Sequence, residues 1–347
     1  MAEARRSVFM TGTGLSRRRF LKTLGVGMAL GLLGDLRAIA QIQTPTTVDF
    51  DMIPGLCPKV TSNEEFYWVE KNIRAHRTRL DRWSLKVEGL VEKKLKFDLE
   101  QLRALPAIEE FNTLECISNE VGGDLISNAK WKGVRMVDLL EMAGVKDSAF
   151  DVAMFADDGY SDSFTVQKAM EPWVIVAYEM NGEPLPTNHG APARVIVPGI
   201  YGMKNVKYLT RIELVDRDFF GFWERRGWDD LAVVKTTAII DAPNRDFRLN
   251  RGQEVFITGI AYTGDRGISA VEVSVDDGDS WNPAVLEDPL AVNTWRRWAY
   301  LWRPEASGRH ILMARATDGQ GTLQIEKQAR PFPSGASGYH TVRVDVR

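Results

Sequence analysis

Cysteine and histidine are scarce in this chain of 347 residues, which holds two cysteines and four histidines. The two thiols, Cys57 and Cys116, could form one disulfide, but they cannot make a disulfide framework, a Cys-x-x-Cys pair or a four-cysteine zinc site. The sequence also lacks a Cys-x-x-Cys-His motif, which excludes a covalently attached c-type haem, and we expect no haem in this chain. At least one thiol therefore needs an explanation of its own.

Phosphate-loop and dinucleotide-binding fingerprints are absent as well, so neither kind of nucleotide site is expected. The remaining composition is ordinary for a globular chain, with 44% hydrophobic, 10% aromatic and 26% charged residues. These proportions exclude the disordered, collagen-like and membrane-polytopic classes. The length exceeds one compact domain of average size, so two domains are expected.

The amino terminus has the layout of a twin-arginine export signal. The basic cluster Ser16 to Lys22 contains three consecutive arginines and is followed by a mildly apolar run from Leu24 to Leu33. That run is far shorter than the roughly 20 residues of a membrane-spanning helix. Ala38-Ile39-Ala40 then supplies the small-x-small pattern of a cleavage site. We therefore expect residues 1–40 to be a signal peptide that directs the chain to the periplasm or another extracytoplasmic space.

Such a signal has two consequences for the mature chain. The twin-arginine route carries proteins that have already folded, commonly because they acquire a cofactor in the cytoplasm, so a bound cofactor is the first thing to look for. Without residues 1–40 the chain keeps 37 Lys and Arg against 45 Asp and Glu, a net charge of −8. This acidic balance argues against a nucleic-acid partner.

From Trp83 to about Asp216 the pattern mixes short strands with helices, which is typical of an α+β domain. Strands are expected at 83–88, 174–180 and 194–197, and helices at 99–105 and 134–143, which Pro106 and Gly144 end. We assign residues 41–220 to this mixed α/β domain.

After residue 220 the helical periodicity disappears. Alternation at period two predicts strands at 254–262, 269–275, 297–302, 310–316 and 340–346, with a turn at Asp276-Asp277-Gly278. This pattern indicates an all-β immunoglobulin-like sandwich over residues 221–347, joined to the first domain by a linker at about 216–235.

Cys116 is the first candidate functional residue. It lies where a short strand runs into the polar, glycine-rich loop Ile117 to Asp124, and loops at strand ends commonly display catalytic residues. A lone cysteine is more often a small buried hydrophobe. In this setting, however, a thiolate suits a soft or high-valent metal, and hydrogen bonds from the loop would lower the thiol pKa. Cys57 is expected to be structural.

Basic residues and glycines gather in a second candidate region, residues 186–207. His189, Arg194 and Lys207 stand among glycines that allow backbone N–H groups to approach an anion closely. A planar arginine fork and a lysine point charge suit a phosphate monoester. The alternative is a solvated basic turn with a buried histidine, which we would favour without the neighbouring cysteine motif.

Together these motifs resemble the molybdopterin oxidoreductases of the sulfite oxidase type, over nearly all of the mature sequence. The resemblance rests on the Cys116 loop, on the segments Tyr178 to Pro186 and His189 to Gly199, on Val206-Lys207, and on the sandwich, which is similar to that family's dimerisation domain. It implies a molybdenum–molybdopterin cofactor and a homodimer formed through the carboxyl-terminal sandwich.

The resemblance also implies roles for individual residues. Cys116 would supply the protein thiolate to molybdenum, beside two dithiolene sulfurs of the pterin and terminal oxygen ligands. The pterin and its phosphate would be held by His189, Arg194, Asn205, Val206 and Lys207. Asp158 would either face the pterin or lie on a surface turn.

One departure from the family's pattern lies in its Trp-x-Arg-Arg-x-Tyr stretch, which carries an active-site tyrosine. This chain has Trp228 in the tyrosine's place, with Arg225 inside the same stretch, and the resemblance puts both in the active site. An indole donates one hydrogen bond but cannot exchange a proton as a phenol does. The handling of protons in the site should therefore differ.

A second departure affects substrate binding. Lys71-Asn72-Ile73 stands where the family has an Arg-Asn-His substrate motif, so the oxyanion arginine is missing there. Arg296 and Arg297 in the sandwich could reach the site or be ordinary surface charges. Sulfite remains the default substrate.

The implied reaction is oxo transfer that converts sulfite, or a related sulfur oxyanion, to sulfate, with electrons passed to an external acceptor. We expect a cytochrome c or a membrane quinone-linked subunit as the acceptor. A reductase of sulfoxides or other oxo compounds is the first alternative, because the motif that binds an anionic substrate lacks its arginine. A non-catalytic exported binding protein is a remote one, and a cysteine hydrolase built on Cys116 and His189 lacks a third orienting group.

Overall fold

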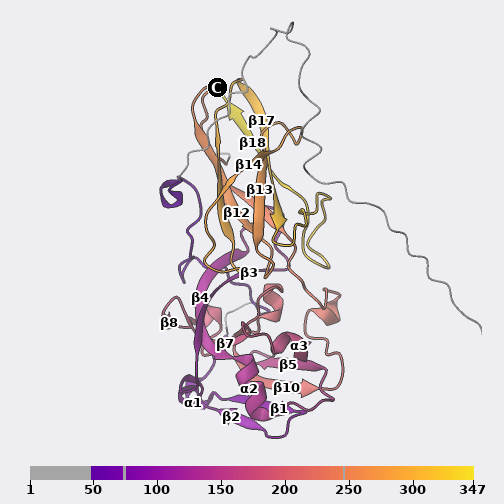
Figure 1. Cartoon of the computed structure of the whole chain (residues 1–347). Helices are drawn as coiled ribbons and strands as arrows, with labels where there is room; N and C mark the ends of the chain where they lie inside the picture. The colour runs from indigo at the N-terminus through magenta and orange to yellow at the C-terminus, as the bar shows by residue number, and fades with distance from the viewer. Residues whose placement is uncertain (1–47, 73–75, 245–246) are drawn as a thin grey trace, which may run out of the picture. The chain divides into compact units, whose positions relative to one another are not determined.

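The structure, a computed structural model of the chain, describes residues 48–72, 76–244 and 247–347 (Figure 1). These residues all belong to one compact unit, Thr44–Arg347. The expected signal peptide, residues 1–40, lies outside the described residues, and so does Ile73. In the part of the chain that the structure describes, no helix combines the length and the hydropathy of a membrane span.

Two sheets form the first domain. The first sheet has the strand order β2-β1-β10-β5-β6 and is mixed, because β1 and β10 run parallel. Its strands are β1 Leu85–Gly89, β2 Leu95–Phe97, β5 Asp151–Ala156, β6 Ser161–Thr165 and β10 Leu209–Val215. The second sheet is antiparallel, with the order β3-β4-β7-β8 and with β9 paired to β7. Its strands are β3 Ile108–Glu115, β4 Ile126–Arg135, β7 Ile175–Met180, β8 Glu183–Pro184 and β9 Arg194–Ile196.

Short helices accompany these sheets. The α-helices are α1 Leu99–Arg103, α2 Met136–Ala143 and α3 Val166–Ala169. Single 3-10 turns lie at η1 Phe50–Met52, η2 Leu80–Arg82, η3 Thr187–His189, η4 Gly202–Lys204 and η5 Glu224–Arg226. One hydrophobic core contains residues from both sheets and from the helices. Its buried members include Val87 of β1, Leu140 of α2, Val176 of β7 and Leu214 of β10.

Helix α2 shows where the sequence pattern is ambiguous. The helix expected at 134–143 begins only at Met136, because Val134 and Arg135 complete β4 by pairing with β7. Both residues fit either pattern, and the pairing with a distant strand decides between them. The helix ends as predicted at Gly144, whose φ of 68° is the left-handed conformation that glycine adopts without strain.

Helix α1 begins with a capping box. The Asp98 carboxylate accepts a hydrogen bond from the backbone N–H of Gln101 (2.8 Å), and the Gln101 side chain accepts one from the Asp98 N–H (2.9 Å). Asp98→Ala should therefore lower the free energy of unfolding by about 1 kcal/mol, measured by urea denaturation. Asp98→Asn keeps the acceptor and should lose less than half as much. Equal losses in the two variants would show that the hydrogen bond accepted by residue 98 is not what stabilises the helix.

The second domain is the expected β-sandwich, which confirms the predicted fold class. Its two antiparallel sheets have the orders β11-β12-β16-β15 and β14-β13-β17-β18. The strands are β11 Thr237–Ala242, β12 Val255–Tyr262, β13 Ile268–Ser274, β14 Asn282–Pro283, β15 Val285–Leu286, β16 Arg296–Trp302, β17 Gly308–Asp318 and β18 His340–Val346. Every strand expected from period-two alternation is present within two residues, and Trp298 lies fully buried in the sandwich core.

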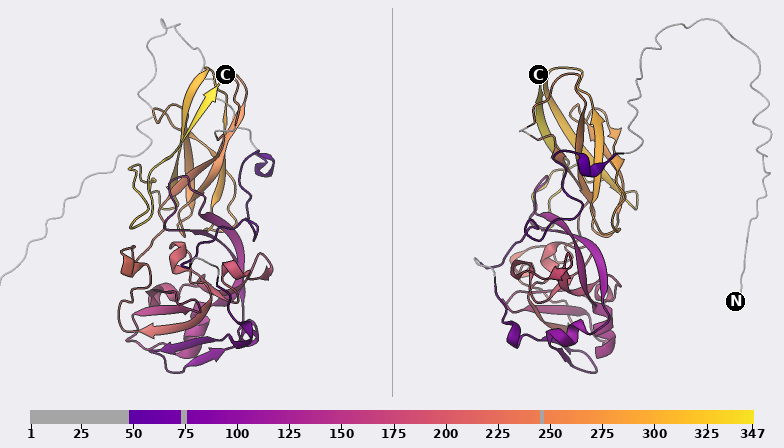
Figure 2. Two further views of the ribbon diagram at one scale, coloured as in Figure 1. Left: turned by 180° about the vertical axis from the view of Figure 1, so that it is seen from behind. Right: turned by 90° about the vertical axis from the view of Figure 1, so that its left-hand side faces the viewer.

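The long β3–β4 ribbon reaches from the first domain to one end of the sandwich (Figures 1 and 2). Thr113 of β3 is the main anchor. Its N–H donates to Asn293 O (3.1 Å), its hydroxyl accepts from Trp295 N–H (2.9 Å), and its carbonyl accepts from Tyr262 Oη (2.7 Å). Because β3 ends directly before Cys116, these bonds to the sandwich fix the strand that presents the candidate metal ligand.

Candidate active site

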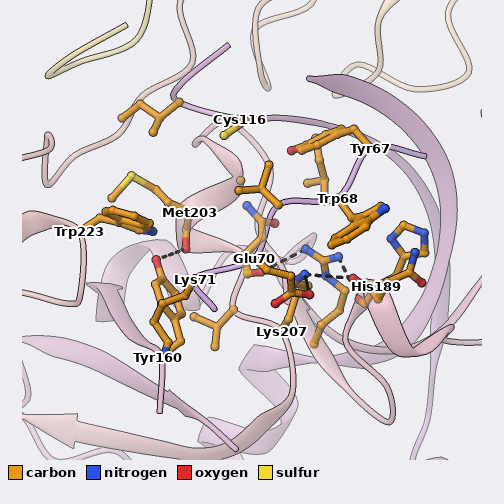
Figure 3. Close-up of a pocket in the computed structure, with 18 of the residues that line it drawn as sticks. Tyr67, Trp68, Glu70, Lys71, Cys116, Tyr160, His189, Met203, Lys207 and Trp223 are labelled. Carbon is orange, nitrogen blue, oxygen red and sulfur yellow. Dashed lines mark hydrogen bonds and ion pairs between the residues drawn. The ribbon is translucent and has the colours of Figure 1, made fainter. Parts of the chain in front are cut away.

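A cavity of about 250 Å³ brings together side chains from segments that are far apart in the sequence (Figure 3). Eight of the nine site residues predicted above line it: Cys116, Asp158, His189, Arg194, Asn205, Val206, Lys207 and Trp228. Figure 3 shows Cys116, Lys207 and Tyr160 approaching the cavity from different segments. The two candidate regions of the sequence therefore form one site.

Arg225 is the predicted residue that the structure does not place in the cavity. It lies in the 3-10 turn η5, where successive side chains point to different sides. Glu224 is buried, whereas Arg225 is exposed and donates a hydrogen bond to the Phe220 carbonyl. The prediction that Arg225 belongs to the active site is corrected accordingly.

Cys116 follows β3 at the edge of the cavity. Its N–H donates to Leu125 O and its carbonyl accepts from Asn119 N–H, both at 2.9 Å, so the loop holds the residue through its backbone. The sulfur lies 3.0 Å from Ser118 Oγ and is not in a disulfide. Burial raises the pKa of the thiol above its ordinary value and outweighs the opposing hydrogen bonds from Ser118. The hydrogen bonds of the loop lower this pKa, as expected, but burial has the larger effect in the chain alone.

Cys57 is also a free thiol and has a different environment. It packs against the cluster that contains Ile239 and Tyr262, and its N–H donates to Asp241 Oδ2 (3.1 Å). Burial raises the pKa of the Cys57 thiol well above its ordinary value. Cys57 does not line the cavity, which agrees with its expected structural role.

Arg194, at the start of β9, is 5% exposed. Its guanidinium donates to His189 O and Asn205 O, both at 3.1 Å, and lies over the Trp131 ring. Among the described residues no carboxylate pairs with it, and its Nε has no hydrogen-bond partner. Burial lowers the pKa of Arg194 to about 10, so the group is still charged at neutral pH. A buried cation without a counter-ion is costly, and an anionic ligand would supply the missing charge.

His189 is buried beside Arg194. Its Nε2 lies 2.8 Å from the Asn63 carbonyl, which can only accept, so Nε2 carries the proton and Nδ1 is left as an acceptor. Burial lowers the pKa of His189 to about 4, and the ring is neutral at pH 7. Gly190 follows with a φ of 104°, and a Cβ at that position would lie 2.9 Å from the Lys207 side chain. The turn therefore needs glycine to bring His189 and Lys207 together.

Lys207 is already paired inside the cavity. Its Nζ lies 2.6 Å from Glu70 Oε1 and donates to Asn188 O (3.0 Å), and Tyr208 Oη donates to the same Glu70 oxygen (2.8 Å). Burial lowers the pKa of Lys207, and the neighbouring carboxylate opposes that effect. A phosphate at Lys207 would therefore compete with the Glu70 carboxylate. Glu70 was not predicted as a site residue.

Asn205 supports the site through its loop. Its side-chain oxygen accepts from Val197 N–H (2.8 Å), its amide donates to Tyr201 O (3.2 Å), and its carbonyl receives the Arg194 bond. Since both side-chain groups are used within the loop, Asn205 positions Arg194. Val206 lines the cavity as a buried apolar residue.

Asp158 lies in a turn that also forms part of the cavity wall. It lines the cavity, and its Oδ1 accepts from Tyr160 N–H (2.9 Å) in a turn. Its carbonyl accepts from Lys71 Nζ (2.9 Å). Lys71 thus takes part in the cavity wall even though the family's arginine is absent from its motif.

Arg296 and Arg297 do not line the cavity. Arg297 is buried in β16, where it pairs with Glu287 at 2.7 Å and with Asp51 at 2.7 Å. Arg296 donates to Glu287 O and Ile268 O, both at 2.9 Å. Neither arginine replaces the missing oxyanion residue, and both serve the sandwich.

The sequence analysis did not identify several other residues that line the cavity, namely Tyr67, Trp68, Glu70, Tyr160, Met203 and Trp223. The available signal was the run Phe66 to Lys71, which is aromatic and charged but has neither strand nor helix periodicity. Such a run is typical of a functional loop.

The charges around the cavity favour an anion. Three cations, Lys71, Arg194 and Lys207, face two carboxylates, Glu70 and Asp158, which leaves a net charge of +1. Within the described ranges, no group of three or more His, Cys, Asp or Glu side chains is placed to hold a metal ion. A free thiol, a buried unpaired arginine and a net positive wall fit a cofactor that carries both a phosphate and most of its own metal ligands.

Comparison with known families agrees with this fit. Residues 72–223 match the oxidoreductase molybdopterin binding domain, and residues 231–346 match the Mo-co oxidoreductase dimerisation domain. The chain belongs to the molybdopterin oxidoreductases of the sulfite oxidase type. The family predicted from the motifs is confirmed, and with it an enzyme rather than a binding protein or a cysteine hydrolase.

Individual members of this family show how far the likeness extends. The mitochondrial sulfite oxidase of Mus musculus is 31% identical over 303 aligned positions, which cover 73% of this chain and 55% of that protein. The uncharacterized oxidoreductase YuiH of Bacillus subtilis is 34% identical over 149 positions, or 43% of this chain and 73% of its own. The crystal structure of the sulfane dehydrogenase SoxCD from Paracoccus pantotrophus has a TM-score of 0.69 at 25% sequence identity. The match covers 79% of this chain and 80% of the SoxCD chain. The chain spans about half the length of the mitochondrial relative.

Proposed function

We propose that this chain is a molybdenum-cofactor oxidoreductase that oxidises sulfite, or a related sulfur oxyanion, and passes the electrons to an external acceptor. The main support is the cavity, because the free thiol of Cys116 and the buried cation of Arg194, which pairs with no carboxylate among the residues that the structure describes, line the same space. The names of the relatives, sulfite oxidase and sulfane dehydrogenase, both point to sulfur chemistry.

When bound, the cofactor supplies oxo transfer and two-electron redox chemistry. Cys116 would provide the protein sulfur. Arg194 and Lys207 would bind the pterin and its phosphate, and the unprotonated Nδ1 of His189 would accept a hydrogen bond from the pterin. Asn205 holds Arg194 in place through its carbonyl. The aromatic and apolar wall, which includes Phe66, would keep bulk water away from the reacting atoms.

Lys71 is the residue proposed to bind the substrate oxyanion. It lies at the motif where the family has an arginine, lines the cavity, and is oriented by the Asp158 carbonyl. Lys71→Met should raise the KM for sulfite about tenfold and change kcat little, because a charge-assisted hydrogen bond made equally in ground and transition states is lost. Steady-state kinetics measures both constants. Lys146→Met removes a lysine that does not line the cavity and should leave the KM unchanged. An unchanged KM in Lys71→Met would exclude this role.

A reductase of sulfoxides or other oxo compounds is the second candidate. Arg296 and Arg297 are engaged elsewhere, so the cavity has fewer cations for an anionic substrate than the family's pattern provides. Protein loaded with molybdenum cofactor should turn over sulfite with cytochrome c as acceptor. Turnover of methionine sulfoxide with a viologen donor, and none of sulfite, would favour the reductase instead.

The proposal also covers the export of the enzyme, its oligomeric state and its electron acceptor. We propose that residues 1–40 direct export by the twin-arginine route, that the sandwich forms a homodimer, and that a cytochrome c or a membrane quinone-linked subunit takes the electrons. The dimerisation-domain match supports the second point. Light scattering that shows a monomer at micromolar concentration would contradict the dimer, and full turnover with oxygen alone would contradict the separate acceptor.

A further inference from the structure

Tyr160 stands in the cavity wall beside two hydrogen-bond acceptors. Its Oη lies 2.6 Å from Asp162 Oδ2 and 2.9 Å from the Met203 carbonyl, and the bond to Met203 is drawn in Figure 3. A phenol has one proton to donate, so it can serve one acceptor at a time. When Asp162 is ionised, Tyr160 donates to it. When Asp162 is protonated, the acid can donate to Tyr160 while Tyr160 donates to Met203. The pair keeps its hydrogen bonds in both protonation states.

A buried charge cluster lies behind this pair. Lys204 Nζ is 2.9 Å from Asp162 Oδ1, 2.8 Å from Glu224 Oε1 and 3.1 Å from Asp230 Oδ1. Three carboxylates surround one ammonium, which would leave a net charge of −2 if all were ionised. Such a charge is costly in a buried site, so the cluster favours binding an extra proton.

Asp162 is the group best placed to hold that proton. It is fully buried, and burial raises its pKa above the usual range. The Lys204 ammonium opposes this shift, and Glu224 reinforces it. The charge of Asp158 helps to raise the pKa of Tyr160, and that of Asp218 helps to raise the pKa of Asp230. The side chain of Asp230 is 34% exposed, so the cluster reaches from the cavity to solvent.

We propose that Tyr160 and Asp162 carry away the protons released in the cavity during substrate oxidation. This inference rests on the proposed function. Sulfite and water give sulfate, two electrons and two protons, and the electrons leave to the external acceptor. Each proton is taken up by Tyr160 Oη as the phenol passes its own proton to the Asp162 carboxylate. The Asp162 carboxyl group then turns so that its proton faces Lys204, and Lys204 takes that proton as it passes one of its own to Asp230. Asp230 releases the proton to solvent, and Lys204 again holds three protons.

The structure favours this pair over the other polar residues of the cavity. Trp228, in place of the family's tyrosine, has an N–H that can donate but no atom that accepts a proton. Tyr208 also donates to a carboxylate, Glu70, but that carboxylate is paired with Lys207, which balances its charge. A carboxylate cluster with spare negative charge and a link to solvent lies behind Tyr160.

Two variants of the full-length chain test the relay. Tyr160→Phe and Asp162→Asn should each lower kcat about 100-fold with the KM for sulfite within twofold of wild type. Wild-type kcat should rise with pH as Asp162 loses its proton, because the acceptor must be ionised, and this rise should be absent from both variants. Asp151→Asn, which removes another buried carboxylate of the same sheet outside the cavity, should keep the wild-type pH profile.

A second measurement does not depend on turnover. Infrared difference spectra of the protein between acid and alkaline pH should contain a carboxylic-acid carbonyl band that Asp162→Asn removes and Tyr160→Phe shifts, while Asp151→Asn leaves it in place. If Asp162→Asn does not fold, the spectra and the pH profile of Tyr160→Phe alone still test the relay. A band and a pH profile unchanged in Tyr160→Phe would overturn the relay even where wild type oxidises sulfite. Wild type that shows the band but does not oxidise sulfite would overturn the proposed function instead.

Discussion

Replacing Cys116 with serine should lower turnover of the proposed reaction by about a thousand-fold or more, while the protein still folds. A serine hydroxyl is a poor substitute for a soft sulfur ligand to molybdenum. The fold should survive because the loop is held through backbone bonds, and the 3.0 Å contact with Ser118 can be kept by a hydroxyl. Steady-state assays of cofactor-loaded protein, together with circular dichroism, measure the two effects separately.

Cys57→Ser is the matched control, because it changes the other free thiol of the chain at a place outside the cavity. It should retain wild-type turnover at a small cost in stability. Normal turnover in Cys116→Ser would refute the assignment of this sulfur as the metal ligand. Purified protein matured in a molybdenum-replete cytoplasm and yet devoid of molybdenum and pterin would remove the whole enzymatic proposal.

Arg194→Met should have opposite effects on cofactor retention and on the stability of the cofactor-free chain. The variant loses a buried cation that donates to two carbonyls and has no carboxylate partner among the described residues. Removing such an uncompensated charge removes its desolvation cost, which offsets the loss of its two hydrogen bonds to carbonyls. The cofactor would lose a charge-assisted hydrogen bond worth about 1.5–3 kcal/mol, so its affinity should fall roughly 10- to 100-fold.

Two measurements separate these effects of Arg194→Met. Molybdenum content and pterin fluorescence after purification should fall, while the Tm of cofactor-free protein should stay equal or rise. Arg211→Met, which removes a partly exposed cation of β10 that does not line the cavity, is the control and should retain full cofactor content. A lower Tm with full cofactor content would show that Arg194 acts as a structural residue and not as an anion-binding one.

The periodic segments of the chain could be predicted from the sequence because their patterns are local. The alternation along the sandwich strands places every second side chain in one core, and Gly144 ends α2 at the expected residue. The ambiguity at Val134 and Arg135 could not be resolved in this way, since pairing with β7 depends on a strand about forty residues away.

The cavity could be predicted in part. Cys116 and the 189–207 region carry recognisable residue types at fixed spacings, which is why eight predicted residues meet there. Arg225 does not line the cavity as predicted, because the orientation of one residue in a 3-10 turn depends on which neighbour is buried. Here the buried neighbour is Glu224. The cluster behind Tyr160 had no sequence signal, because Asp162, Lys204 and Asp230 lie on three separate segments.

The sequence by itself determined the two-domain order, the family and the thiol that lines the cavity, since each depends on a short motif or on a local period. Only the tertiary structure decided which charges remain free. Lys207 is paired with Glu70 and Arg297 with Glu287, whereas no carboxylate of the described residues pairs with Arg194. Charge pairing depends on distances of a few ångströms between segments that the linear order does not bring together, because the Coulomb energy falls with separation and with exposure to water.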